Sequence, residues 1–156
     1  MTELIYHPLF NDPSIVSYYR MEGNSNDSKG SNNGTDTTIT YNTSNGQFAQ
    51  GAGFGGTSKI SLGTSSTLNP AAISIVGWVK ATSFTNAYNA VQARSTDVDG
   101  SKFCALFVKS NGKLACFVFA TASVNYDGTG ANTLSTGTWY HLAMTYSSTD
   151  GLRGYV

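Results

Sequence analysis

Short apolar runs separated by clusters of turn-forming residues are the feature of this sequence that most limits its fold. The runs are rich in β-branched and aromatic residues, which predict strands, and the Gly, Asn, Ser, Thr and Asp clusters between them predict turns. No stretch repeats apolar residues at i, i+3, i+4 and i+7 together with capping residues, so we expect almost no helix. Strands are expected at residues 15–21, 37–41, 59–62, 73–80, 90–93, 103–109, 113–120, 138–146 and 152–156. So many short strands in 156 residues predict one all-β domain, a sandwich or a barrel.

A hairpin is expected over residues 103–120, around the Asn-Gly dipeptide at residues 111–112, which is typical of a two-residue turn. With that turn, Cys104 and Cys116 point to opposite faces of the sheet. We therefore expect two free, buried cysteines and no disulfide. Both faces of the hairpin are apolar, which predicts a central position with packing on each side.

The charge balance is even, with nine basic and nine acidic side chains and a net charge of zero. No basic patch is visible, so we expect no nucleic-acid binding. No run of about 18 apolar residues occurs, so we expect no membrane-spanning segment. The N-terminus lacks a basic segment followed by an apolar one, so no Sec signal peptide is expected. We expect the protein to stay inside the cell or to become extracellular by a non-Sec route, which includes packaging into a virion.

Four stretches, in order, resemble the laminin-G-like, concanavalin-A-like jelly-roll superfamily of lectins and glucanases. The first, within residues 16–30, is an aromatic pair followed by Glu-Gly-Asn and then by Asp-Ser-Lys-Gly. The second is Phe-Gly-Gly before a short strand, at residues 53–62, and the third is the Trp-bearing run Ile-Ser-Ile-Val-Gly-Trp-Val-Lys at residues 73–80. The fourth is Gly-Thr-Trp at the start of residues 137–146.

This resemblance implies a two-sheet antiparallel jelly-roll sandwich over residues 15–156, with residues 1–14 as an N-terminal arm. In the family, the Tyr-Val that stands here at residues 155–156 continues into further strands. The resemblance therefore implies a sandwich that is incomplete at its C-terminus. An open sheet edge invites pairing with another chain, so we expect a homodimer or a larger oligomer formed through that edge.

Catalytic residues are not expected. Glucanases of this fold need two carboxylates across the scissile bond, but the two glutamates of the chain, Glu3 and Glu22, are far apart. His141 lies on an expected strand beside Trp139, and we expect a packed core histidine because no Gly-x-Ser-x-Gly elbow accompanies it. Trp78 and Trp139 are likewise expected to fill the core. The prediction is a domain that is not an enzyme.

Calcium is the one cofactor that the resemblance suggests. Relatives hold a structural Ca²⁺ near the early Glu-Gly-Asn loop, and the matching positions here are Glu22 and Asn24. Carboxylate and amide oxygens are suitable ligands for this ion. In the family, the site shares ligands with a C-terminal strand for which this sequence has no match.

Aromatic residues beside amides and a carboxylate, in two loop-like segments, are the candidate ligand-binding residues. They are Tyr88 with Asn89, and Tyr126 with Asn125 and Asp127. Such groups on loops suit a sugar ligand. Together with the resemblance, they predict a non-catalytic, lectin-like module that binds a carbohydrate or glycan. The alternative is a structural or protein-interaction module that self-associates, such as a virion or surface-appendage component, because a fold does not by itself define a function.

Overall fold

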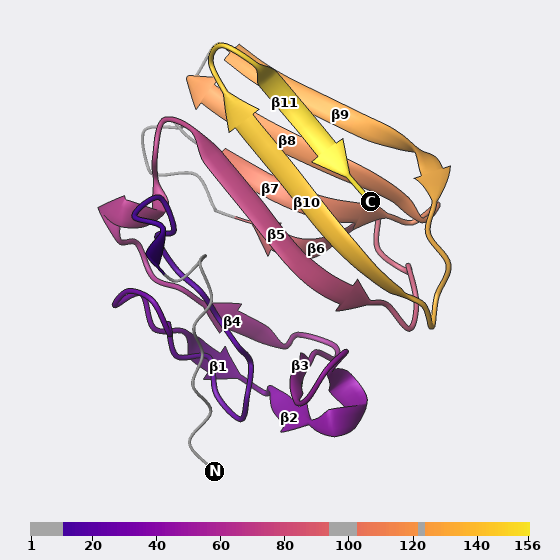
Figure 1. Ribbon diagram of the computed structural model, residues 1–156. Coiled ribbons are helices and arrows are strands. Elements are labelled where there is room, and N and C mark those ends of the chain that lie inside the picture. The colour runs from indigo at the N-terminus through magenta and orange to yellow at the C-terminus, as the bar shows by residue number, and fades with distance from the viewer. Residues whose placement is uncertain (1–10, 94–102, 122–123) are drawn as a thin grey trace. The chain divides into compact units, whose positions relative to one another are not determined.

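The computed structural model describes residues 11–93, 103–121 and 124–156, with the side chains of all of these except residues 103, 119–121 and 124–127. The chain divides into two compact units, Met1–Asn69 and Pro70–Val156, which we call the N-terminal and the C-terminal unit (Figure 1). The expected division into an arm and a single sandwich beginning at residue 15 stays a prediction. No helix in the described ranges is both long enough and apolar enough to cross a membrane.

Short strands and tight turns make up the N-terminal unit. Antiparallel pairs join β1 (Thr35–Thr37) to β4 (Lys59–Ser61) and β2 (Thr40–Asn42) to β3 (Gly51–Gly53), and the 3-10 turns are η1 (Thr43–Asn45) and η2 (Ser66–Leu68). Each 3-10 turn is capped by a side chain, that of Asn42 or Ser65, which accepts a backbone N–H. Three polar side chains of this unit are buried, namely those of Ser25, Asp27 and Asn32. Hydrogen bonds therefore contribute much of the internal structure of this unit.

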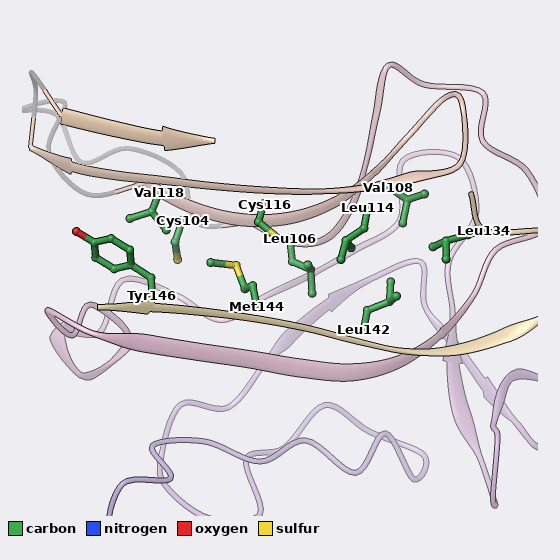
Figure 2. Close-up of a cluster of buried hydrophobic side chains, with 10 residues drawn as sticks. All are labelled: Cys104, Leu106, Val108, Leu114, Cys116, Val118, Leu134, Leu142, Met144 and Tyr146. Atoms are coloured by element: carbon green, nitrogen blue, oxygen red, sulfur yellow. The ribbon is translucent and has the colours of Figure 1, made fainter. Parts of the chain in front are cut away.

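Two antiparallel sheets form the C-terminal unit. Its strands are β5 (Ile73–Lys80), β6 (Tyr88–Ala93), β7 (Phe103–Lys109), β8 (Lys113–Thr121), β9 (Val124–Thr133), β10 (Trp139–Ser147) and β11 (Gly151–Tyr155). One sheet has the order β6-β7-β8-β9 and the other the order β11-β10-β5. The two sheets face each other with side chains between them (Figure 2). The predicted all-β, two-sheet antiparallel sandwich is confirmed, and the β7–β8 hairpin is central in its sheet, as expected.

Apolar side chains from both sheets fill the space between them (Figure 2). The buried cluster consists of Cys104, Leu106, Val108, Leu114, Cys116, Val118, Leu134, Leu142, Met144 and Tyr146. Leu106 of one sheet and Leu142 and Met144 of the other are completely buried. Full burial of such a side chain is worth about 1.5–3 kcal/mol. This layer is therefore a main source of stability for the unit.

The β7–β8 hairpin differs from the sequence prediction by one residue. Its loop consists of residues 110–112, because the N–H of Gly112 donates to the carbonyl of Lys109 over 2.8 Å. Gly112 has a φ of +75°, and a left-handed residue after a type I turn is typical of three-residue hairpin loops. The predicted two-residue turn is therefore wrong, and Leu106 lies opposite Cys116 in the register.

The three-residue loop places both cysteines on the core face, which corrects the prediction that they point to opposite faces. Residues directly opposite each other in an antiparallel pair share a face. Cys104 lies opposite Val118, and Cys116 lies opposite Leu106, so the two thiols are diagonal neighbours on the same face. Both thiols are free, so the expected absence of a disulfide is confirmed for a different geometric reason.

His141 and both tryptophans lie on the outer face of the three-stranded sheet, so the prediction that they fill the core is wrong. Trp78 lies opposite His141, with their ring centres 5.3 Å apart, and Trp78 is 45% exposed. The ammonium of Lys80 lies 5.0 Å from the ring centre of Trp139. The alternate residues of β10, including Leu142, fill the core instead, because successive side chains of a strand point to opposite faces.

Candidate ligand-binding surface

Three aromatic rings are in contact on the outer face of the four-stranded sheet. The ring centre of Tyr88 lies 5.5 Å from that of Phe107 and 5.6 Å from that of Phe117, and the two phenylalanine rings are 5.8 Å apart. These separations, with tilted or edge-on orientations, are favourable for aromatic pairs. We call Tyr88, Phe107 and Phe117 the aromatic platform. Tyr88 is 50% exposed, so this platform presents a ring to solvent.

Strand register explains how the platform forms. Phe107 lies opposite Ala115, and Phe117 lies opposite Ala105, so each large ring is paired with a small side chain across the central hairpin. Both alanines are completely buried. Residue Tyr88 comes from the neighbouring strand β6, and its ring contacts both phenylalanines. The three rings therefore hold one another in place on adjacent strands.

A lysine stands beside the platform. Lys109 lies opposite Tyr88 in the register, and its Nζ is 5.9 Å from the centre of the tyrosine ring. The same Nζ donates a hydrogen bond to Oγ1 of Thr129 on β9, over 2.8 Å. The ammonium is thus held between an aromatic face and a hydroxyl group, a favourable position for a cation. The surface combines an apolar ring with a fixed positive charge.

The first pair of predicted ligand-binding residues is separated by the strand geometry. Tyr88 belongs to the platform. Asn89 lies opposite Val108, a core residue, and its amide nitrogen donates to the carbonyls of Asn86 (3.0 Å) and Val108 (2.9 Å). Asn89 therefore stabilises the start of β6, and a role in ligand binding remains a prediction for both residues.

The second group of predicted residues, Asn125, Tyr126 and Asp127, lies in β9. Their backbones face residues 117–119 of β8 in the antiparallel register. Their side chains lie outside the described part of the structure, so their ligand-binding roles stay predictions.

Phe107, Phe117 and Lys109 are absent from the sequence-based candidates. The apolar residues on the outer face of the hairpin could have indicated a binding surface, but the predicted two-residue turn assigned Phe107 and Phe117 to opposite faces. The three-residue loop brings them to the same face. Loop length therefore decides whether the platform can be recognised from the sequence.

A buried carboxylate organises the loop that follows the Glu-Gly-Asn motif in the N-terminal unit. Oδ1 of Asp27 accepts the backbone N–H groups of Tyr18, Lys29 and Gly30, each over 3.0 Å, and Oδ2 accepts that of Asn32 over 3.1 Å. Burial raises the pKa of Asp27, but the backbone donors outweigh burial and hold the pKa at about 2, below the ordinary value of 3.8. This carboxylate has a structural role.

A groove of about 410 Å³ contains the two residues predicted to bind calcium. It is lined by Arg20, Glu22, Asn24, Asn26, Asp27 and Ser28. Oε2 of Glu22 accepts the N–H of Gln50 over 3.3 Å, and Oδ1 of Asn24 accepts the N–H of Asn26 over 2.9 Å. Calcium takes about six to eight oxygen ligands, and the described residues hold no cluster of three or more His, Cys, Asp or Glu side chains. Amide and backbone carbonyl oxygens also bind calcium, so Ca²⁺ at Glu22 and Asn24 in this groove stays a prediction.

The two facing antiparallel sheets of the C-terminal unit form a β-sandwich. The family model of the concanavalin A-like lectin/glucanases superfamily matches residues 54–156, which include β4 and every strand of the C-terminal unit. Because the match covers more than half of the sequence, the chain belongs to this superfamily, as the resemblance implied. No curated protein and no solved structure matches the chain. Domains of this kind often bind carbohydrates or mediate interactions, and they are generally non-catalytic.

Proposed function

We propose that this chain is a non-catalytic carbohydrate-binding module and that the aromatic platform is its binding surface. The half-exposed ring of Tyr88, held against Phe107 and Phe117, is the observation that carries the proposal. Membership of a superfamily whose domains often bind carbohydrates supports it.

The chemistry of a pyranose ring matches this surface. One face of the sugar presents C–H groups, which are buried favourably against an aromatic ring. Tyr88 is already fixed by its two aromatic neighbours, so little side-chain freedom is lost on binding. Lys109 and Thr129 stand beside the ring and can exchange hydrogen bonds with sugar hydroxyl groups.

Binding without cleavage is the expected activity of the platform. Glycosidases generally place two carboxyl groups about 5–9.5 Å apart, on either side of the scissile bond. The described side chains that form and flank the platform are aromatic, ammonium and hydroxyl groups. We therefore propose that the bound oligosaccharide is released intact, and an assay for new reducing ends after prolonged incubation tests this.

The test of binding is a glycan array followed by titration calorimetry on the strongest ligand. Tyr88→Ala is expected to weaken binding by about 5- to 150-fold, because loss of aromatic stacking on a sugar ring costs about 1–3 kcal/mol by analogy with base stacking. Tyr88→Phe is expected to keep most of the affinity, since the ring remains.

Tyr155 offers a matched control. It is 47% exposed, close to the 50% of Tyr88, but it lies in β11 of the other sheet. Tyr155→Ala should leave glycan affinity unchanged. Equal losses in Tyr88→Ala and Tyr155→Ala, or unchanged affinity in Tyr88→Ala, would show that the platform is not the binding surface.

A second candidate function is self-association through the edge of the three-stranded sheet. Within the described part of the chain, β11 pairs with β10 alone. An opening of about 140 Å³ beside this strand is lined by Leu114, Cys116, Gly128, Thr129, Gly130, Leu152 and Gly154. Leu152 is half-buried at this opening, whereas Leu114 and Cys116 are covered. A strand added along β11 could place a side chain against Leu152.

Light scattering after size exclusion, over a range of concentrations, tests self-association. A dimer formed through β11 should dissociate in Tyr155→Lys, because lysine on an edge strand opposes further pairing. Tyr88→Ala should leave the dimer intact. A monomeric mass at the highest concentration tested would exclude this second function.

A further inference from the structure

Two lysines lie on the outer face of the four-stranded sheet, at one end of the aromatic platform. Lys109 ends β7 and Lys113 begins β8, on either side of the loop at residues 110–112. Lys109 lies opposite Tyr88 on this face. Lys113 is two residues before Ala115, which lies opposite Phe107, so strand alternation places Lys113 on the same face.

These ammonium groups have no carboxylate partner among the residues whose side chains are described. Lys109 contacts the ring of Tyr88 and the hydroxyl of Thr129, both of which are uncharged. An ammonium group has three N–H donors, and the bond to Thr129 uses one of them. Lys109 and Lys113 therefore place two positive charges at this end of the face.

We propose that the platform binds an acidic saccharide, with the sugar ring on Tyr88 and its carboxylate on Lys109. This inference rests on the proposed carbohydrate-binding function and names the class of ligand, a uronic-acid-containing oligosaccharide. A carboxylate accepts the free N–H donors of Lys109 in a charge-assisted hydrogen bond. Lys113, across the loop at residues 110–112 from Lys109, adds a second positive charge that attracts the same acidic ligand.

Lys109 differs from an ordinary surface lysine in that its ammonium group is held beside the ring on which the sugar would stack. Its Nζ is held 5.9 Å from the ring centre of Tyr88 and 2.8 Å from Oγ1 of Thr129. The carboxylate of a uronic acid is attached directly to the pyranose ring, so a uronic acid stacked on Tyr88 can place its carboxylate within reach of Lys109. Part of the entropic cost of fixing the lysine side chain is thereby removed before binding.

The experiment compares a trigalacturonate with its methyl ester, which has the same sugar rings without the charge. Wild-type protein is expected to bind the acid at least tenfold more tightly at low ionic strength, and this preference should shrink as salt is added. Lys109→Met should weaken binding of the acid roughly tenfold, the usual value of a hydrogen bond to a charged group, and should leave the ester within about twofold. Lys109→Arg should retain the preference.

Several outcomes would overturn the inference. Equal affinity of wild type for acid and ester would exclude an acidic ligand, and equal losses for both in Lys109→Met would mean that the lysine only positions Tyr88. Asp127 lies opposite Phe117 in the backbone register and therefore on the face that carries the platform. The variant Asp127→Asn is therefore tested in the same titrations. A loss of acid binding in that variant would also count against the assignment to Lys109.

Failure of this inference and of the proposed function can be told apart. If a neutral glycan binds, and Tyr88→Ala abolishes that binding while the trigalacturonate does not bind, the platform is a carbohydrate site but not an acidic one. If no saccharide on the array or in the titrations binds, both proposals fail together.

Discussion

Replacing Asp27 by asparagine tests how the N-terminal unit is held together. The carboxylate accepts four backbone N–H groups, those of Tyr18, Lys29, Gly30 and Asn32. Asparagine keeps one acceptor oxygen but places an NH₂ group where a second acceptor is needed, so at least one buried N–H loses its partner. The remaining bonds also lose their charge assistance.

The pKa of Asp27 gives the size of the effect. A folded-state pKa of about 2, against the ordinary 3.8, corresponds to about 2 kcal/mol of stabilisation, because a tenfold change in proton affinity is worth about 1.4 kcal/mol. The stabilisation is fully present above pH 3.8 and is lost as the pH falls through 2. Asp27→Asn should therefore destabilise this loop by about 2 kcal/mol at neutral pH, comparable with the loss of a charged hydrogen bond.

Amide hydrogen exchange of Gly30 and Asn32, followed by NMR on the full chain, is the assay. A loss of about 2 kcal/mol predicts that these amides exchange roughly 30-fold faster in Asp27→Asn at neutral pH, because the open state is populated roughly 30-fold more. In wild type, protection corrected for the intrinsic rate should decrease between about pH 4 and pH 2, whereas in Asp27→Asn that decrease should be absent.

Asp12 provides the control. Its Oδ1 accepts the N–H of Ser14 over 2.8 Å at an exposed position, and asparagine can make the same bond. Asp12→Asn should leave exchange at Gly30 unchanged. A change of less than twofold at Gly30 in Asp27→Asn, or an effect as large in Asp12→Asn, would refute the structural role of the buried carboxylate.

Three further predictions concern the sandwich. Leu142→Ala removes a completely buried side chain and should cost about 3 kcal/mol, measured by urea denaturation with tryptophan fluorescence; a loss below about 1 kcal/mol would contradict the packing. Gly112→Ala should cost at least about 1–2 kcal/mol in the same assay, since the residue has a φ of +75° and a Cβ there would lie 2.7 Å from the carbonyl oxygen of Leu134. An unchanged midpoint would contradict the left-handed conformation and the close approach at this residue. Burial raises the pKa of Cys116 to about 11, so a thiol reagent at pH 8 should react with this residue only after denaturation. Rapid modification of Cys116 in the native protein would contradict this prediction.

Most strands of the C-terminal unit could be predicted from the sequence, because alternation and turn residues act locally. The exception is β9, which occupies a segment predicted to be loop-like. The two-sheet arrangement was implied by the family resemblance and not by the local pattern. The hairpin register could not be predicted. An Asn-Gly dipeptide fits the centre of a two-residue turn and also the last two positions of a three-residue loop. The choice is made by the core, which requires Leu106 and Cys116 on one face. The strand expected at residues 15–21 is reduced to a bridge at Tyr19, since the N–H of Tyr18 donates to a carboxylate.

Predicting the faces of β5 and β10 from residue size alone gave the wrong result. Tryptophan is the largest apolar side chain, but Trp78 and Trp139 alternate with a more continuous apolar set that includes Ile75 and Met144. The complete pattern of alternation was therefore a better guide than the single largest residue. For the candidate surface, Tyr88 was chosen from the sequence as an aromatic residue in a loop-like segment, but it is the first residue of strand β6. Its aromatic neighbours required the correct register.

The alanines beneath the platform give the sheet a way to change its outer surface without changing its fold. Ala105 and Ala115 are completely buried, and each lies opposite a phenylalanine. Volume can be exchanged within such a cross-strand pair while the total is conserved, a kind of substitution that packed regions tolerate. Each exchange would move an aromatic ring to the neighbouring strand, about 5 Å away. If the platform binds a saccharide as proposed, ligand preference in related chains can diverge through buried alanines such as these, and a comparison restricted to exposed positions would miss them.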